Sequence, residues 1–159
     1  MLFRISALPV DAFQGLFSLS DEALRERGAK RYVASHTPGF PCRVSLQDAA
    51  PGERVILLSY LHQPADSPYR SSGPIFVREE ATQVMPEAGE VPGLLRLRTL
   101  SVRAYDARSL MIDGVLVEGP QLESAVSKLF ANPRVEYLHI HYAGTGCYAC
   151  RVDRVVPSC

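Results

Sequence analysis

The sequence carries no excess charge of either sign. Seventeen basic residues stand against seventeen acidic ones in a chain of 159 residues, so the strongly basic footprint of a nucleic-acid-binding protein is missing. No apolar run approaches the length that is needed to cross a bilayer, and the first residues lack the apolar core and cleavage site of a signal peptide. We therefore expect one cytoplasmic domain over residues 1–159, without nucleic-acid or membrane partners.

Cysteine is also scarce, and the easily recognised catalytic motifs are absent. Four cysteines in a chain long enough to bury its own core do not indicate the disulfide framework of small secreted domains. The sequence contains no Gly-rich phosphate loop, no H-E-x-x-H and no G-x-S-x-G. These absences exclude the well-marked enzyme classes and lead us to expect reduced thiols.

What remains is a pattern typical of an α+β fold. We expect a single compact domain with a largely antiparallel sheet, two or three helices and a C-terminal β-hairpin. The run 54–61 is apolar enough for a central strand buried on both faces, and Asp113–Gly114 suggests a turn. Short apolar or alternating segments predict strands at residues 2–8, 30–35, 41–46, 54–61, 74–79, 100–106 and 109–113, and a hairpin at 135–142 and 147–154.

Two segments have the features of helices. In residues 18–29, Ser20 can cap a helix whose first turn is acidic. Residues 119–133 predict a helix with an apolar stripe formed by Leu122, Val126, Leu129 and Phe130.

Two irregular stretches rich in proline and glycine, residues 62–73 and 83–93, are long enough to be binding loops.

The densest group of chemically reactive side chains lies in the predicted hairpin, at residues 136–154. If Tyr142 pairs with Cys147 across a four-residue turn, residues that face each other point to the same side. Residues three apart in a strand point to opposite sides, which argues against a zinc or redox C-x-x-C site at Cys147 and Cys150. One face of the hairpin would instead carry His139, His141, Tyr148 and Cys150.

Three interpretations of this face stay open. His139, His141 and Cys150 can act as acids, bases or nucleophiles, and they are our candidate catalytic residues. The same three residues are suitable ligands for zinc or another transition metal, although no particular cofactor is predicted. Alternatively, these side chains only fill space in an ordinary hairpin.

Arginines and tyrosines form a second candidate group. Guanidinium groups and tyrosine hydroxyls suit a carboxylate or a phosphate. The alternative is that each arginine pairs with an acidic residue on the surface. We expect a small anionic ligand to be bound by Arg43, Tyr69, Arg70, Arg103, Tyr105 and Tyr148.

We predict that Cys42 is a buried structural thiol.

Four segments of the chain carry a resemblance to a known family. In this order and at this chain length, they resemble the bacterial domain of unknown function 1203 family. The resemblance covers nearly the whole chain and implies a single bacterial domain. It implies no established activity, so no catalytic residue is carried over. The segments are CRVSLQDAAPGERVILLSY, SPYRSSGPIFVRE, RAYD and GCYACRVDR.

Three functions are therefore consistent with the sequence. The first is a small-molecule-binding protein, in its sharper form an enzyme that acts on an anionic metabolite through an arginine, histidine and tyrosine pocket. The second is a non-catalytic structural or interaction module with packed histidines and cysteines. The third is a transition-metal-binding protein.

Overall fold

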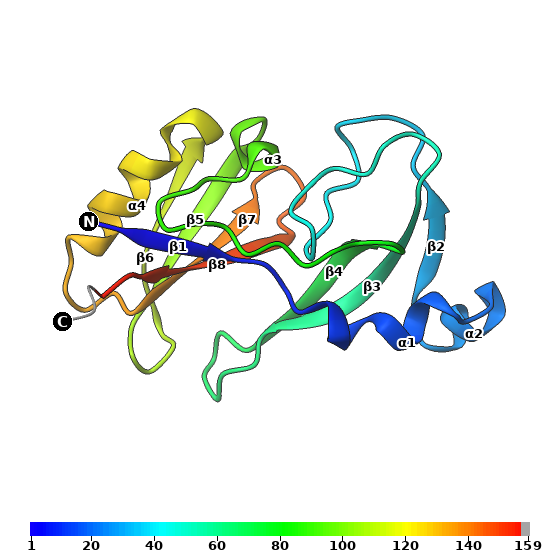
Figure 1. Cartoon of the computed structure of the whole chain (residues 1–159). Coiled ribbons are helices and arrows are strands. Elements are labelled where there is room, and N and C mark those ends of the chain that lie inside the picture. The colour runs from blue at the N-terminus through cyan, green and yellow to red at the C-terminus, as the bar shows by residue number, and fades with distance from the viewer. Residues whose placement is uncertain (157–159) are drawn as a thin grey trace.

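Two antiparallel sheets lie side by side in the computed structural model, which describes residues 1–156 (Figure 1). The first sheet has five strands in the order β1-β8-β7-β5-β6, and the second has three in the order β2-β3-β4. The predicted α+β fold with a C-terminal hairpin is confirmed. The strands are β1 (Phe3–Ser6), β2 (Lys30–Val33), β3 (Arg54–Gln63), β4 (Ser71–Arg78), β5 (Thr99–Tyr105), β6 (Met111–Glu118), β7 (Tyr137–Tyr142) and β8 (Tyr148–Arg154).

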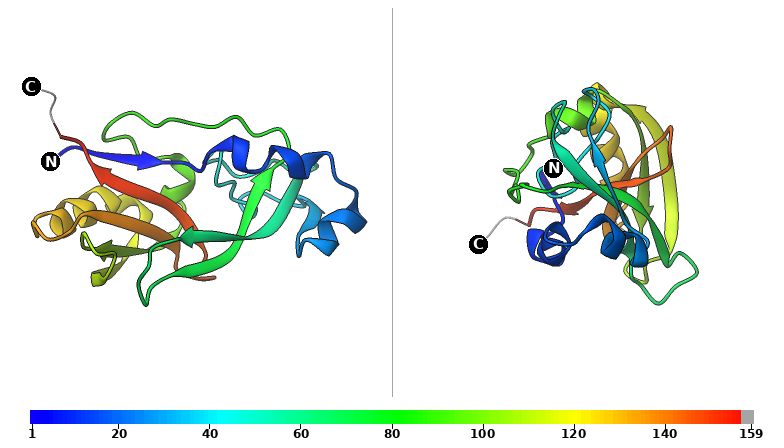
Figure 2. Two further views of the ribbon diagram at one scale, coloured as in Figure 1. Left: turned by 90° about the horizontal axis from the view of Figure 1, so that it is seen from below. Right: turned by 90° about the vertical axis from the view of Figure 1, so that its right-hand side faces the viewer.

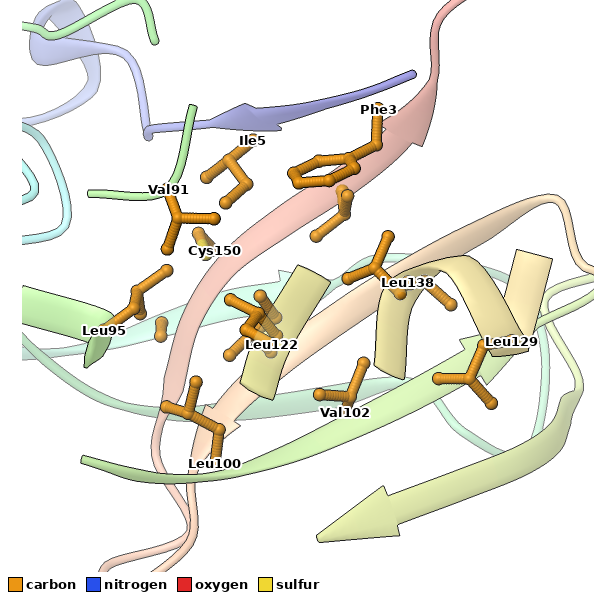
Figure 3. Packing of buried hydrophobic residues seen from close by; sticks show 14 of the residues in the cluster. Phe3, Ile5, Val91, Leu95, Leu100, Val102, Leu122, Leu129, Leu138 and Cys150 are labelled. Carbon is orange, nitrogen blue, oxygen red and sulfur yellow. The ribbon is translucent and has the colours of Figure 1, made fainter. Parts of the chain in front are cut away.

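The main hydrophobic core lies between the five-stranded sheet and one helix. This helix, α4 (Leu122–Phe130), follows a 3-10 turn, η2 (Gly119–Gln121). Its predicted apolar stripe is buried, and Figure 3 shows Leu122 and Leu129 packed over Leu100, Val102 and Leu138 of the sheet. Burial of apolar side chains therefore holds α4 in place.

The remaining helices are short. Helix α2 (Asp21–Glu26) begins as predicted, because Ser20 Oγ accepts a hydrogen bond from the amide of Ala23 at 3.1 Å. Figure 2 shows α1 and α2 beside the three-stranded sheet, at the end of the molecule away from α4. The single-turn elements are η1 (Val10–Ala12), α1 (Gln14–Phe17) and α3 (Gly93–Arg96). Within residues 1–156, no helix has the length and apolar composition of a bilayer-spanning segment.

Two local predictions are wrong. Residues 41–46 form a turn with isolated bridges, because the Leu46 amide returns to the Cys42 carbonyl and Leu46 has a φ of +50°. Asp113 lies inside β6, opposite Ala104. The chain turns earlier, where the carboxylate of Asp106 accepts hydrogen bonds from the amides of Arg108 and Leu110.

Strand β3 is longer than predicted and less buried. It is the middle strand of the three-stranded sheet, as its apolar sequence suggested. However, Ser59 and Leu61 are exposed, so it is not buried on both faces. The strand continues through His62 and Gln63, which removes both residues from the predicted loop.

The two sheets meet where the end of β3 approaches the hairpin of β7 and β8. The amide nitrogen Nε2 of Gln63 donates to the hydroxyl of Tyr137 at 2.8 Å. The guanidinium Nε of Arg43 donates to the carbonyl of Tyr148, also at 2.8 Å. The candidate site lies at this junction, a common place for ligand sites in proteins.

Candidate functional site

Three imidazole rings converge at the junction of the two sheets. His62 comes from β3, whereas His139 and His141 come from β7. One ring nitrogen of each residue lies within 4.8 Å of the other two. His139 and His141 are only 2% and 1% exposed, and His62 is half-buried. We call these three residues the histidine cluster.

Irregular strand pairing accompanies the histidine cluster. The β3–β4 register shifts between Tyr60 and Gln63, a segment that includes His62. The β7–β8 register shifts between Ile140 and His141. A bulge adds one residue to a strand and re-aims the side chains around it. The bulge in β3 therefore helps to direct His62 into the cluster, whereas the extra residue of the second irregularity lies in β8, at Ala149.

Tyr148 packs against all three histidines. Its ring stacks on His62 with centroids 5.0 Å apart and an angle of 7° between planes. It meets His139 and His141 edge-on, at 5.1 and 5.7 Å. This contact prevents large movements of the imidazoles and so keeps the three rings in one cluster.

Two stacked tyrosines, Tyr105 and Tyr137, close the other side of His139, and we call this pair the tyrosine wall. The rings of Tyr105 and Tyr137 lie 5.2 Å apart, and they tilt against His139 at 5.1 and 5.2 Å. The hydroxyl of Tyr137 accepts from Gln63 and donates to Ser109 at 2.9 Å. The predicted ligand residues Tyr105 and Tyr148 thus both lie against the histidines.

Burial keeps the histidines neutral near pH 7. Burial lowers the pKa of His139 to about 3, with smaller contributions from His141 and nearby arginines. Burial likewise lowers the pKa of His141 to about 4 and depresses the pKa of His62. A neutral imidazole carries one N–H and one lone pair. Each ring therefore has a nitrogen that can coordinate a metal or accept a proton.

The hydrogen bond of His141 fixes which of its nitrogens carries the proton. Its Nδ1 lies 2.9 Å from the carbonyl oxygen of Gly146, which can only accept, so Nδ1 donates. Gly146 has a φ of +76°, a backbone conformation that favours glycine, and this turn presents the carbonyl. The lone pair of His141 must consequently lie on Nε2.

The buried nitrogens of the cluster lack partners. Within residues 1–156, no hydrogen bond is made by Nδ1 of His62, Nδ1 of His139 or Nε2 of His141. Leaving a buried polar atom unpaired costs roughly 1–3 kcal/mol. Three such atoms in one cluster are unusual in a folded protein and require an explanation.

An arginine without an acidic partner stands beside the cluster. Arg103 of β5 lies directly opposite His139 of β7, and its side chain is half-buried. Its Nε approaches the hydroxyl of Ser101 at 3.4 Å, but no carboxylate of the described residues lies within 4.0 Å. The uncompensated positive charge of Arg103 therefore adjoins neutral imidazoles.

Cys150 does not belong to this face, contrary to our expectation. Tyr142 pairs with Cys147 and His141 with Tyr148 as predicted, but the bulge then places Cys150 opposite Ile140. Cys150 is 1% exposed within the hydrophobic core (Figure 3), and burial raises the pKa of its thiol to about 12. His139 and Cys150 thus lie on opposite faces.

Of the other predicted ligand residues, only Tyr69 lies near the histidine cluster, whereas Arg70 and Arg43 lie elsewhere. Tyr69 reaches the tyrosine wall, edge-on to Tyr105 at 6.0 Å. Arg70 is exposed and donates to the carbonyl of Pro64 in its own loop, so it binds its own backbone. Arg43 lines a cavity that none of the three histidines lines. Cys42 is fully buried, as predicted.

His62 is the member of the cluster that the sequence did not indicate. It follows a strand-like run and opens the stretch 62–73, whose proline and glycine content predicts a loop. Its alternation with Leu58 and Tyr60 was the available signal. That signal could not show that β3 approaches β7, because the two strands belong to different sheets.

Comparison with known proteins identifies the family. The family described as "Protein of unknown function (DUF1203)" matches residues 39–154. The chain belongs to the DUF1203 family. No curated protein and no solved structure matches the chain.

The DUF1203 match has two consequences for the site. It confirms the resemblance inferred from the sequence segments, but the match begins at residue 39 and so covers less of the chain than we expected. The matched residues include the histidine cluster, its tyrosine wall and Arg103, and they leave out β1, α1, α2 and β2. The candidate site lies wholly inside the DUF1203 region, and the family description states no activity, so the function must be argued from the site's chemistry.

Proposed function

We propose that this DUF1203 protein binds a transition-metal ion, with zinc the best-matched ion, through His62, His139 and His141. Two observations carry the proposal: one ring nitrogen of each histidine converges on the same point, and each of the three rings has a buried nitrogen that lacks a hydrogen-bond partner. Zinc commonly takes histidine nitrogens in a tetrahedral arrangement. Three protein ligands leave the fourth position open for a small molecule.

The charge state of the cluster favours a cation over an anion. Neutral imidazoles near pH 7 can direct lone pairs toward one another, and a cation relieves their mutual repulsion. An anion would need N–H groups that point inward. The N–H of His141 is already committed to the carbonyl of Gly146.

The geometry is close to what a zinc ion requires. With zinc–nitrogen distances of 2.0–2.1 Å, two nitrogens of a tetrahedral site lie about 3.3 Å apart. The nitrogens of the cluster are within 4.8 Å of one another, so small ring rotations close the site. The carbonyl of Gly146 would act as the outer-sphere partner that typically orients a metal-binding histidine.

Arg103 suggests what completes the site. A lone cation would be repelled by this unpaired guanidinium, which faces His139. A small anion in the fourth position would instead be attracted by both positive charges. In this arrangement the metal and the arginine together bind an anionic molecule, which unites our first and third sequence-based hypotheses. The cluster of ligating groups contains no carboxylate among the described residues, so histidines alone would hold the ion.

The test is a competition titration of zinc between the untagged protein and a chromophoric chelator. We expect one ion per chain. Changes to the outer-sphere partners of a metal site lower metal affinity 10–100-fold. Loss of a direct ligand should therefore lower the affinity for zinc at least about 100-fold, and we expect this in His62→Gln, His139→Gln and His141→Gln. His36 is the fourth histidine of the chain and is exposed, so His36→Gln is the matched control.

Two results would contradict the proposal. The first is a wild-type protein that takes no zinc from the chelator. The second is a folded His62→Gln variant that binds zinc as tightly as His36→Gln. Either would favour the hypothesis of a non-catalytic module whose histidines are only packed.

A further inference from the structure

A cavity opens beside the turn of the β7–β8 hairpin, away from the histidine cluster. Its volume is about 600 Å³, within the range of small-molecule sites. None of the three histidines lines it. Its walls come from the turn of the hairpin, strands β3 and β4, and the segment before Arg43, and its main apolar side chains are Pro38, Pro41, Leu57, Pro74 and Phe76.

A buried arginine without a carboxylate partner faces this cavity. Arg43 is 2% exposed, and it donates to two backbone carbonyls, those of Pro41 and Tyr148. Within residues 1–156, its Nη2 makes no hydrogen bond and no carboxylate oxygen lies within 4.0 Å. Carbonyl groups solvate a guanidinium but do not neutralise it, so the charge of Arg43 stays uncompensated.

The other arginine of the cavity provides a contrast. Arg98 forms an ion pair with Asp48, in which Nη1 lies 2.9 Å from Oδ2. Both guanidinium groups lie over the ring of Tyr142, each 5.1 Å from its centroid. One of the two charges is therefore neutralised inside the protein, and the other is left for a ligand.

Tyr142 supplies a second unpaired group at the same place. Its side chain lines the cavity, and its hydroxyl is buried without a hydrogen-bond partner among the described residues. A guanidinium and a hydroxyl are both donors that suit a carboxylate. A guanidinium with an unpaired Nη2 and a hydroxyl without a partner thus meet at one mostly apolar cavity.

We propose that this cavity binds a small organic carboxylate with an apolar body. The carboxylate pairs with Arg43 and accepts a hydrogen bond from the hydroxyl of Tyr142. The apolar body lies against Leu57, Pro74 and Phe76. One uncompensated cation matches one negative charge, and the apolar walls favour a hydrocarbon body over a polyanion such as a nucleotide.

This site is independent of the proposed metal site. Tyr142 follows His141 on β7, and successive residues of a strand point to opposite faces. The histidine cluster and the cavity share no side chain. Loss of zinc binding would therefore leave this proposal intact, and failure of this proposal would leave the metal site intact.

Cys147 offers a direct readout, because it lines the cavity and is partly exposed. Cys42 and Cys150 are buried, and Cys159 can be replaced by serine. In Cys159→Ser protein, the rate of Cys147 alkylation is measured with increasing 2-naphthoate. The neutral control ligand is 2-naphthamide, which has the same shape. We expect saturable slowing of at least tenfold with the carboxylate and none with the amide.

Variants assign the effect to the two donors. Arg43→Gln should abolish the protection, and Tyr142→Phe should weaken it several-fold while it keeps the ring. Arg4→Gln, which removes one exposed positive charge from β1, is the control and should behave like the parent.

Three outcomes would overturn the proposal. They are no saturable protection by 2-naphthoate, equal protection by 2-naphthamide, and unchanged protection in a folded Arg43→Gln variant. Because Arg43 also holds two backbone carbonyls, Arg43→Gln could fail to fold. Tyr142→Phe then decides alone, and unchanged protection in that variant overturns the proposal.

Discussion

The ring of His62 lies 5.2 Å from the ring of His141, although the two residues belong to different sheets. A metal ion held by both would join the three-stranded sheet to the five-stranded sheet. Formation of the site requires the folded arrangement of both sheets, so binding and stability must be linked.

The first prediction is that zinc stabilises the folded protein. A free zinc concentration of 100 times Kd should raise the free energy of unfolding by about 2.7 kcal/mol, because the ion binds the folded state. Thermal unfolding with and without zinc measures this gain. His62→Gln should lose it and His36→Gln should keep it. Equal gains in the two variants would show that zinc acts elsewhere.

The second prediction concerns acid. The pKa values of His139 and His141 are about 3 and about 4 in the folded protein, against about 6.5 in an unfolded chain. Below pH 6.5 the unfolded chain therefore binds protons first, and the stability of the metal-free protein falls until the folded pKa values are reached.

At pH 5, protonation of each of these two histidines in the unfolded chain should lower the free energy of unfolding by roughly 2 kcal/mol relative to pH 7. Urea unfolding in the presence of a chelator at the two pH values measures the loss. A double variant, His139→Gln with His141→Gln, should show a much smaller difference. Equal stability of the wild-type protein at both pH values would mean that these histidines are not buried as neutral groups.

The third prediction tests the packing of α4. Leu129 is buried against the five-stranded sheet, so Leu129→Ala should lower the free energy of unfolding by roughly 2–5 kcal/mol. Leu116 of β6 is 72% exposed and provides the control, since exposed substitutions usually change stability by less than about 0.5 kcal/mol. A Leu129→Ala variant as stable as Leu116→Ala would contradict this packing.

The fold could be predicted where the local pattern determines the structure. The apolar stripe of residues 122–130 is buried as helical periodicity requires, and the turn between Tyr142 and Cys147 sets the start of the hairpin. Residues 41–46 show the limit. Their alternation suits a strand, but local hydrogen bonds around Cys42 favour a turn, and the alternation does not distinguish the two.

The site could be predicted only in part, for two physical reasons. One additional residue at Ala149 moves Cys150 to the other face, and nothing in the sequence marks this bulge. The approach of His62 depends on how two sheets pack, which pairing rules within a sheet do not specify. His139, His141 and Tyr148 were placed together because the turn alone determines their register.

The fourth prediction concerns the thiols. Cys147 and Cys150 are both unpaired, and only Cys147 is accessible, because Cys150 is buried in the core. Alkylation of the native protein without reduction should therefore modify Cys147 and spare Cys42 and Cys150. Peptide mapping by mass spectrometry gives the answer. A linked Cys147–Cys150 peptide would contradict the strand geometry of β8.

The central claim is that three histidines alone hold a transition-metal ion, and X-ray absorption of the zinc-loaded protein tests it most directly. We predict a first shell of nitrogen or oxygen at about 2.0–2.1 Å, with the outer scattering of imidazole rings and no sulfur. A sulfur contribution near 2.3 Å would assign the ion to a cysteine. Such a contribution, or a first shell without imidazole scattering, would contradict the claim.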